Sequence, residues 1–189
     1  GQGLLAPGNL PLLYLSIFVL KIFHEMAHAI VCKRYGGEVH SMGVMFIVFT
    51  PLPYIDASAS WSMRGRWHRA YVGAAGMIVE LVLAALAAWV WAYTGPGFVN
   101  CLAFNLMLAG SISALLFNGN PLLRFDAYYI LTDLVELPNL YQKAAQQWFY
   151  YGDRFLYGTD RAESPARSPR EAAWFTGYGL LSVIYRLFI

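Results

Sequence analysis

Long apolar runs separated by short polar stretches dominate the pattern of this sequence. The four longest runs cover residues 10–32, 70–94, 98–117 and 172–189. A helix needs about 20 predominantly apolar residues to cross the hydrocarbon core of a bilayer, so the first three runs predict membrane-spanning helices. The fourth run is 18 residues long and ends with the chain, and we expect a further transmembrane helix there that is cut short.

The segment that follows the first apolar run has a different pattern. Residues 39–48 are rich in β-branched and aromatic side chains, which predicts one or two strands that end at Pro51 and Pro53. Lipid cannot hydrogen-bond the edge of a strand. We therefore expect this apolar β element to be buried in protein or to line a cavity.

Composition supports a membrane protein. Hydrophobic residues make up 58% of the chain and charged residues 13%, whereas soluble domains average about 45–50% and about 25%. A net charge of +2 is too small to suggest nucleic-acid binding, so we predict no nucleic-acid partner. Cys32 and Cys101 lack metal-ligand spacing and are interpreted as small buried hydrophobic residues.

These patterns divide the chain into three regions. Residues 1–138 form a membrane-embedded core, 139–170 form a more polar segment at the membrane surface, and 171–189 form the last apolar helix. The chain lacks an initiator methionine and ends inside an apolar run, so we expect it to be part of a longer protein. Basic residues flank the loop between the first two spans, at Lys33, Arg34, Arg64, Arg66 and Arg69, which predicts that this loop is cytoplasmic.

Three ionisable residues interrupt the first apolar run, in the stretch FVLKIFHEMAHAIVCK at residues 18–33. His24 and His28 are four residues apart, so on a helix they share one face with Cβ atoms about 5–6 Å apart. Each can give one nitrogen to a single zinc ion. Glu25 lies beside them, where it can accept a proton from a water activated by the metal.

The alternative is that these residues are polar core groups that pair with neighbouring helices. Ionisable side chains at membrane depth cost a few kcal/mol each. The alternative must therefore supply partners for all three residues, and a metal site satisfies them together. The spacing H-E-x-x-H inside a spanning segment favours zinc.

A catalytic zinc site usually has a third protein ligand. The favoured candidate is Asp126 in FNGNPLLRFDAYYILTD, residues 117–133, where Asn118, Pro121 and Asp126 form the pattern N-x-x-P-x-x-x-F-D. Asp126 also precedes a predicted short helix at 127–137, where aspartate is a favoured N-cap. Spacing alone leaves both interpretations of Asp126 open.

The two motifs together resemble the site-2 protease family of intramembrane zinc metalloproteases. HEMAH in one membrane helix and an Asn-Pro…Asp motif about a hundred residues later carry the resemblance, which runs from about residue 10 to about residue 140. The stretch NPLLRFDAYY most closely resembles the corresponding sequence in the bacterial branch of peptide zinc metalloproteases. The resemblance implies an α-helical polytopic membrane protein with a site-2 protease-like helical core and a small embedded β element.

The resemblance also implies roles for single residues. His24, His28 and Asp126 correspond to the zinc ligands, Glu25 to the catalytic base, and Asn118 to the asparagine that helps to hold the substrate. The family's strands after the first motif helix hold the substrate extended, and here residues 38–49 occupy that place. Such an edge can take over the backbone hydrogen bonds of an unwound substrate. An ordinary buried hairpin is the other interpretation.

Two departures from the family pattern affect the site. Phe125-Asp126-Ala127 replaces Leu-Asp-Gly, which puts a methyl group beside the ligand. In the second span, GAAGMIVEL places Glu80 where relatives often carry an asparagine. Glu80 can stabilise a metal ligand, serve proton transfer, or pair with a donor on another helix, and the last of these is favoured.

The sequence therefore predicts a zinc-dependent endopeptidase that cleaves a peptide bond within or near the membrane. The expected partners are the lipid bilayer and a membrane protein or peptide substrate, and the expected location is the bacterial inner membrane. The alternative is a non-proteolytic zinc-binding subunit that serves as a scaffold for other subunits of a larger membrane complex. The Ala127 departure and the cut-short ends favour this alternative, whereas the intact H-E-x-x-H motif favours the enzyme.

Overall fold

A computed structural model describes residues 6–47, 50–56, 61–155, 157–158 and 163–188. Over these residues the elements follow in the order α1 (Leu10–Arg34), β1 (Met42–Ile47), β2 (Thr50–Ile55), α2 (Arg66–Tyr93), α3 (Phe98–Ile112), η2 (Ser113–Asn118), α4 (Asp126–Val135), α5 (Leu140–Phe155) and α6 (Pro169–Phe188). The element η2 is a π-helical turn that continues α3 without a break. The predicted fold class, largely helical with a small β element, is confirmed.

Three helices of the described chain are long and apolar enough to cross a membrane: α1, α2, and α3 together with η2. They coincide with the first three apolar runs of the sequence. The fourth run forms α6, which has 20 residues but does not reach the same combination of length and hydropathy. Its predicted role as a spanning helix remains a prediction.

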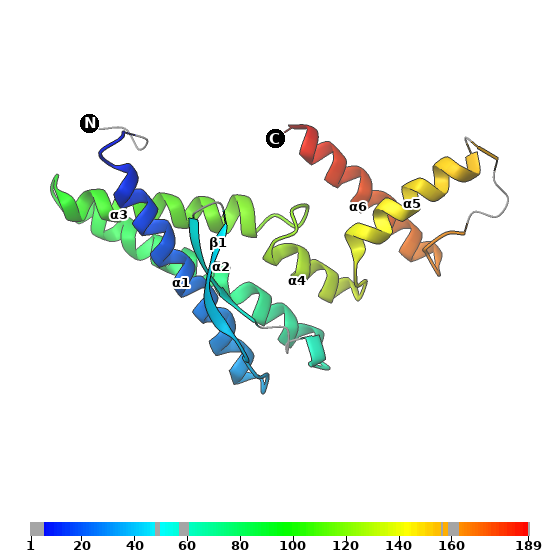
Figure 1. Cartoon of the computed structure of the whole chain (residues 1–189), viewed down its shortest axis with the longest axis horizontal. Coiled ribbons are helices and arrows are strands. Elements are labelled where there is room, and N and C mark those ends of the chain that lie inside the picture. Colours follow the sequence, from blue (N-terminus) through cyan, green and yellow to red (C-terminus); the bar gives the residue numbers. More distant parts are fainter. Residues whose placement is uncertain (1–5, 48–49, 57–60, 156, 159–162, 189) are drawn as a thin grey trace.

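The three long helices pack against one another at one end of the molecule (Figure 1). The buried residues of α2 are mostly small, namely Ala70, Val72, Ala75, Gly76, Glu80, Ala84 and Ala87. Small residues let helix backbones approach closely, which is how helices associate without a hydrophobic driving force in lipid. At Gly110 of α3, an added Cβ would lie 3.2 Å from both Ala84 Cβ and the Glu80 carbonyl oxygen.

The outward faces of these helices carry large apolar side chains. Ile30, Val82 and Leu86 are each more than half exposed. In water such a surface would be costly, whereas a bilayer solvates it at no cost. The exposed apolar faces and the three candidate spans together indicate an integral membrane protein.

The β element is an antiparallel hairpin in which Val44 faces Pro53 and Phe46 faces Pro51. The prediction that the strands end at the prolines was wrong, because β2 contains both. The hydrogen bond from the Asp56 N–H to the Ser41 carbonyl fixes which facing pairs are bonded, and pairs alternate along an antiparallel ladder. Both prolines therefore occupy positions whose missing N–H would point away from β1, as an edge strand allows.

The expectation that this apolar element is buried or lines a cavity holds only in part: Met42 and Ile55 line a cavity against α1, but most of β1 is not buried. β2 packs against α1, and the hairpin lies beside that helix (Figure 1). In β1, however, Met42, Val44, Met45 and Phe46 are all exposed. The hairpin has only two strands, so in the described chain the outer edge of β1 has no strand partner.

The remaining helices form a second cluster at the other end of the molecule, where α5 and α6 cross (Figure 1). Tyr128 of α4 packs there with a buried set that consists of Leu137, Leu140, Ala144, Phe175 and Tyr178. The predicted polar segment 139–170 thus contains the helix α5. Ser164, which follows this helix in the chain, donates a 2.9 Å hydrogen bond from its hydroxyl to the side-chain oxygen of Gln147 in α5. The division of the chain into three regions remains a prediction.

The paired amides of Asn9 and Asn105 generate a prediction for stability. They exchange hydrogen bonds of 3.1 and 2.8 Å in a buried position between the start of α1 and the middle of α3. We expect Asn105→Ala to lower the free energy of unfolding by about 1 kcal/mol, the scale of interhelical hydrogen bonds in membrane proteins. Denaturant titration of the detergent-solubilised protein measures this, with Val99→Ala on the exposed face of α3 as a control that should change little.

Candidate metal centre

Two helices bring three ligand atoms to one point. His24 and His28 lie one turn apart on α1, and Asp126 is the first residue of α4. The Nε2 atoms of the two histidines are 3.1 Å apart. Asp126 Oδ2 lies 3.1 Å from His24 Nε2 and 3.7 Å from His28 Nε2. These three residues form a cluster that could hold a metal ion.

The separations match a tetrahedral zinc site. Donor atoms at the usual distances of about 2.0–2.1 Å from a tetrahedral zinc ion lie about 3.3–3.4 Å from one another, and the observed separations of 3.1–3.7 Å bracket that value. Asp126 Oδ2 is buried and makes no aligned hydrogen bond in the described chain. A buried carboxylate oxygen without such a bond needs a partner, and a cation at this point would supply it.

The position of Asp126 corrects one interpretation from the sequence. Phe125 is the N-cap of α4 and Asp126 is its first helical residue, so Asp126 does not cap the helix as proposed. Burial alone would raise the pKa of the Asp126 carboxyl, but its contacts with His24 and His28 outweigh burial and hold that pKa well below the usual range. A metal at this point requires the ionised form of the carboxylate.

The other ring nitrogen of each histidine faces an acceptor on α2. His28 Nδ1 lies 2.7 Å from the carbonyl oxygen of Val72, and His24 Nδ1 lies 3.2 Å from Glu80 Oε1. An acceptor at Nδ1 favours the tautomer that carries its proton there and leaves the Nε2 lone pair for a metal. Both Nε2 atoms point toward Asp126, so this tautomer suits the site.

Two glycines of α2 make room for the ligands. A Cβ built at Gly76 would overlap the ring of His24, and one built at Gly73 would lie 2.9 Å from Ile130 of α4. Gly76 thus forms the surface on which the His24 ring lies. Gly73 lets α4, the helix that starts with Asp126, approach α2. The sequence GAAG at 73–76 therefore places ligands from both neighbouring helices.

A cavity of about 340 Å³ opens beside the ligand cluster. Glu25, His28 and Asp126 line it together with Ile55 at the end of β2. Glu25 is partly buried and lies outside the ligand cluster. Its carboxylate shares this cavity with two of the three candidate ligands, so a molecule bound there can contact both the carboxylate and the metal position.

Comparison with known proteins identifies the family of this chain. The family description Peptidase family M50 matches residues 12–169. The chain belongs to peptidase family M50. Peptidases of this family are in general site-2-type intramembrane zinc metallopeptidases, and the resemblance noted from the two motifs is confirmed. No curated protein and no solved structure matches the chain.

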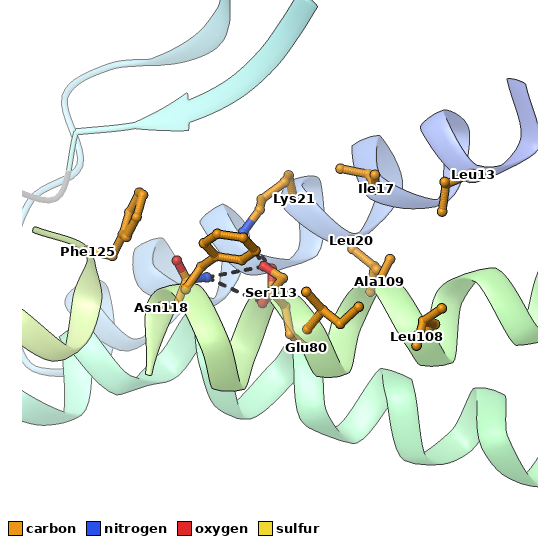
Figure 2. Close-up of a pocket in the computed structure, with 12 residues that line it drawn as sticks. Leu13, Ile17, Leu20, Lys21, Glu80, Leu108, Ala109, Ser113, Asn118 and Phe125 are labelled. Atoms are coloured by element: carbon orange, nitrogen blue, oxygen red, sulfur yellow. Dashed lines mark hydrogen bonds and ion pairs between the residues drawn. The ribbon is translucent and has the colours of Figure 1, made fainter. Parts of the chain in front are cut away.

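Asn118, for which the motif implies a substrate role, lies at a different cavity of this M50 peptidase. That cavity has a volume of about 400 Å³ and is lined mostly by apolar side chains of α1 and α3 (Figure 2). Asn118 is buried at the end of η2, and its amide lies 3.4 Å from Glu80 Oε2 and 3.5 Å from Ser113 Oγ. Its role in holding substrate remains a prediction.

Lys21 and Ser113, for which no sequence pattern predicted a role, contact Glu80 in the structure. Lys21 Nζ lies 2.8 Å from Glu80 Oε1 and 2.9 Å from Ser113 Oγ. Lys21 precedes His24 by three residues, so helical periodicity does place the two on one face of α1. No sequence signal indicated that this face meets Glu80, which is 59 residues further along the chain. Of the three roles open for Glu80, pairing with a donor on another helix is observed.

The contact between Gly76 and His24 gives a direct test of the site. We expect Gly76→Ala to displace the His24 ring and to weaken zinc binding at least about tenfold, since losing even a hydrogen-bond partner of a ligand costs about 10–100-fold in metal affinity. Metal analysis and chelator competition on the purified protein measure this effect.

Gly177→Ala is the matched control, because a Cβ at this position of α6 meets nothing within 4 Å. The control should bind zinc as tightly as the unsubstituted chain. Equal zinc affinity in both variants would contradict the assignment of His24 as a ligand.

Proposed function

We propose that this M50 peptidase is a zinc-dependent endopeptidase that cleaves a peptide bond within or near the membrane. In this proposal His24, His28 and Asp126 hold the zinc ion and Glu25 is the general base. One observation carries it: the three donor atoms lie within 3.1–3.7 Å of one another beside a cavity that Glu25 also lines. Membership of family M50 supports it independently.

In the proposed reaction the zinc ion and the residues of the chain have separate roles. A bound zinc ion supplies Lewis acidity, which polarises the scissile carbonyl and acidifies water. Glu25 accepts the proton of the attacking water and delivers it to the amine of the departing peptide, as a carboxylate of this kind can do in both directions. The cavity beside Glu25 and Asp126 has the room for a substrate backbone.

The outer edge of the hairpin strand β1 offers a place where the substrate backbone can bind. A peptide bond inside a helix is shielded by its own hydrogen bonds, so cleavage requires local unwinding. The N–H groups of Met42, Val44 and Phe46 point away from β2, because their partners in the register form the non-bonded pairs. An unwound substrate segment can pair with this free edge by β-augmentation.

The proposed substrate is therefore a membrane protein or a membrane-bound peptide, and the proposed location is the bacterial inner membrane.

Ala127, the departure from the family pattern next to Asp126, is half-buried as the second residue of α4, and the ligand atoms converge beside it. The non-proteolytic scaffold that serves other subunits is the competing proposal, and catalysis separates the two.

The decisive experiment compares zinc content and peptide cleavage in the purified chain and in Glu25→Gln. We expect zinc to be retained in both proteins, because Glu25 is not a ligand. Cleavage should fall by about 10²–10⁴-fold in the variant, the usual contribution of a general base. Zinc without any cleavage that depends on Glu25 would favour the scaffold. A chain without zinc would overturn both proposals.

Substrate pairing with β1 has its own test. Val44→Pro removes one outward N–H without removing a hydrogen bond of the hairpin, since Val44 faces Pro53 in a non-bonded pair. We expect cleavage to fall roughly two- to tenfold, because a hydrogen bond contributes about 0.5–1.5 kcal/mol. Zinc affinity should not change. Val44→Ala keeps the N–H and is the control; if it slows cleavage as much as proline does, the side chain matters rather than the edge.

A further inference from the structure

We propose that Glu80 is a positioning residue that fixes the ring of His24 for metal binding, and that Lys21 holds Glu80 in place. This inference rests on the proposed function, because it assigns a role around the same zinc ligand. Glu80 is completely buried, and so is His24 apart from 3% of its surface. Two ionisable residues at membrane depth require partners, and here they lie against each other.

The carboxylate of Glu80 is held from three directions. Its Oε1 atom accepts hydrogen bonds from Lys21 Nζ at 2.8 Å and from Ser113 Oγ at 3.2 Å, and its Oε2 atom lies 3.4 Å from the amide of Asn118. Figure 2 shows the four side chains gathered between Phe125 and the apolar residues of α1 and α3 that line the rest of the cavity. The same Oε1 atom lies 3.2 Å from His24 Nδ1. Glu80 thus joins donors on α1 and η2 to a candidate ligand.

The π-helical turn explains how two of these donors reach one carboxylate. Ser113 and Asn118 are the first and last residues of η2, and their side chains lie 3.5 Å apart. A π-helix makes i→i+5 hydrogen bonds, so residues five apart come onto one face, which an α-helix would not allow. Turns of this kind occur frequently at functional sites. The turn therefore places a hydroxyl and an amide together against Glu80.

The His24 ring lies against Gly76, and its Nδ1 edge faces Glu80. Gly76 lies directly against the ring, so the backbone of α2 restricts the plane of the His24 imidazole. The Nδ1 atom is buried and makes no aligned hydrogen bond in the described chain, and the Glu80 oxygen at 3.2 Å is an acceptor within reach. Contacts around catalytic groups are often long before the site is fully assembled. A proton on Nδ1 directed at Glu80 leaves Nε2 free for the metal.

The chemistry of such a contact is well defined. A carboxylate that accepts the N–H of a ligating histidine fixes the tautomer and makes the other nitrogen a stronger ligand. The ammonium of Lys21 compensates the charge of Glu80, since an unpaired buried carboxylate would be strongly destabilising. The pair therefore delivers a fixed acceptor to His24 without adding net charge to the interior.

The competing explanation is that Lys21 and Glu80 merely join α1 to α2. Replacing a buried ion pair by apolar side chains of similar size is often neutral for stability, so the pair can be removed as a unit. The variant Lys21→Met/Glu80→Leu leaves no acceptor for His24. The variant Lys21→Met/Glu80→Gln is also neutral but keeps an amide oxygen at the same position. These two variants differ only at residue 80, and there chiefly in the acceptor.

The measurement is the dissociation constant of Zn²⁺ from the purified full chain in detergent, by chelator competition. The absorption spectrum of Co²⁺ in the same site reports the ligand geometry. We expect Lys21→Met/Glu80→Leu to bind Zn²⁺ about 10–100-fold more weakly than the unsubstituted chain, the usual effect of losing such a partner. Lys21→Met/Glu80→Gln should stay much closer to the unsubstituted chain. Equal affinities and equal cobalt spectra for the two variants overturn the inference.

Glu80→Asp decides the matter if the leucine variant does not fold. It keeps the negative charge that Lys21 needs but withdraws the carboxylate from His24 by one methylene, so zinc affinity should fall while the ion pair persists. Unchanged affinity in Glu80→Asp contradicts the inference. Asn105→Ala is the matched control, a buried polar residue of α3 paired with Asn9; its zinc affinity should not change. An unsubstituted chain that binds no zinc would instead refute the proposed function.

Discussion

The close approach of α1 to α2 at Gly76 is the constraint on which the rest of the site depends. Ionisable side chains are costly at membrane depth unless they meet partners, and α1 carries four of them within eight residues, from Lys21 to His28. Because α2 has no side chain at Gly76, the His24 ring can lie against its backbone. That position brings Nδ1 to Glu80 and Nε2 to Asp126. A side chain at residue 76 would separate both pairs at once.

The helix α2 supplies none of the three candidate ligands, yet it positions all of them. Its Val72 carbonyl contacts His28, Gly73 admits α4 with Asp126, and Gly76 and Glu80 fix His24. These four residues lie within nine positions of one helix face. Ligand atoms that must match a small ion need support from rigid elements, and a helix with small buried residues provides such support here.

The sequence predicted the parts of this site that are local. A spacing of four residues places His24 and His28 on one helix face whatever the tertiary structure, and apolar run lengths identified α1, α2 and α3 with η2. It did not predict that α4 begins at Asp126, because aspartate is compatible with both the cap and the first turn. The pairing of Lys21 with Glu80 was also not predictable, since it depends on which faces of two helices meet. The prediction that the strands end at Pro51 and Pro53 was wrong because proline is tolerated at outward-facing positions of an edge strand.

Glu25 bears on the choice between an enzyme and a scaffold. Holding a metal requires His24, His28 and Asp126, whose atoms form the cluster without Glu25. Holding a metal as a scaffold does not require Glu25, and a partly buried carboxylate in a spanning helix costs free energy. Glu25 nevertheless lines a cavity that also reaches His28 and Asp126. The cavity leaves open space beside the metal position, as catalytic zinc sites do and closed structural sites do not. Both features favour the peptidase.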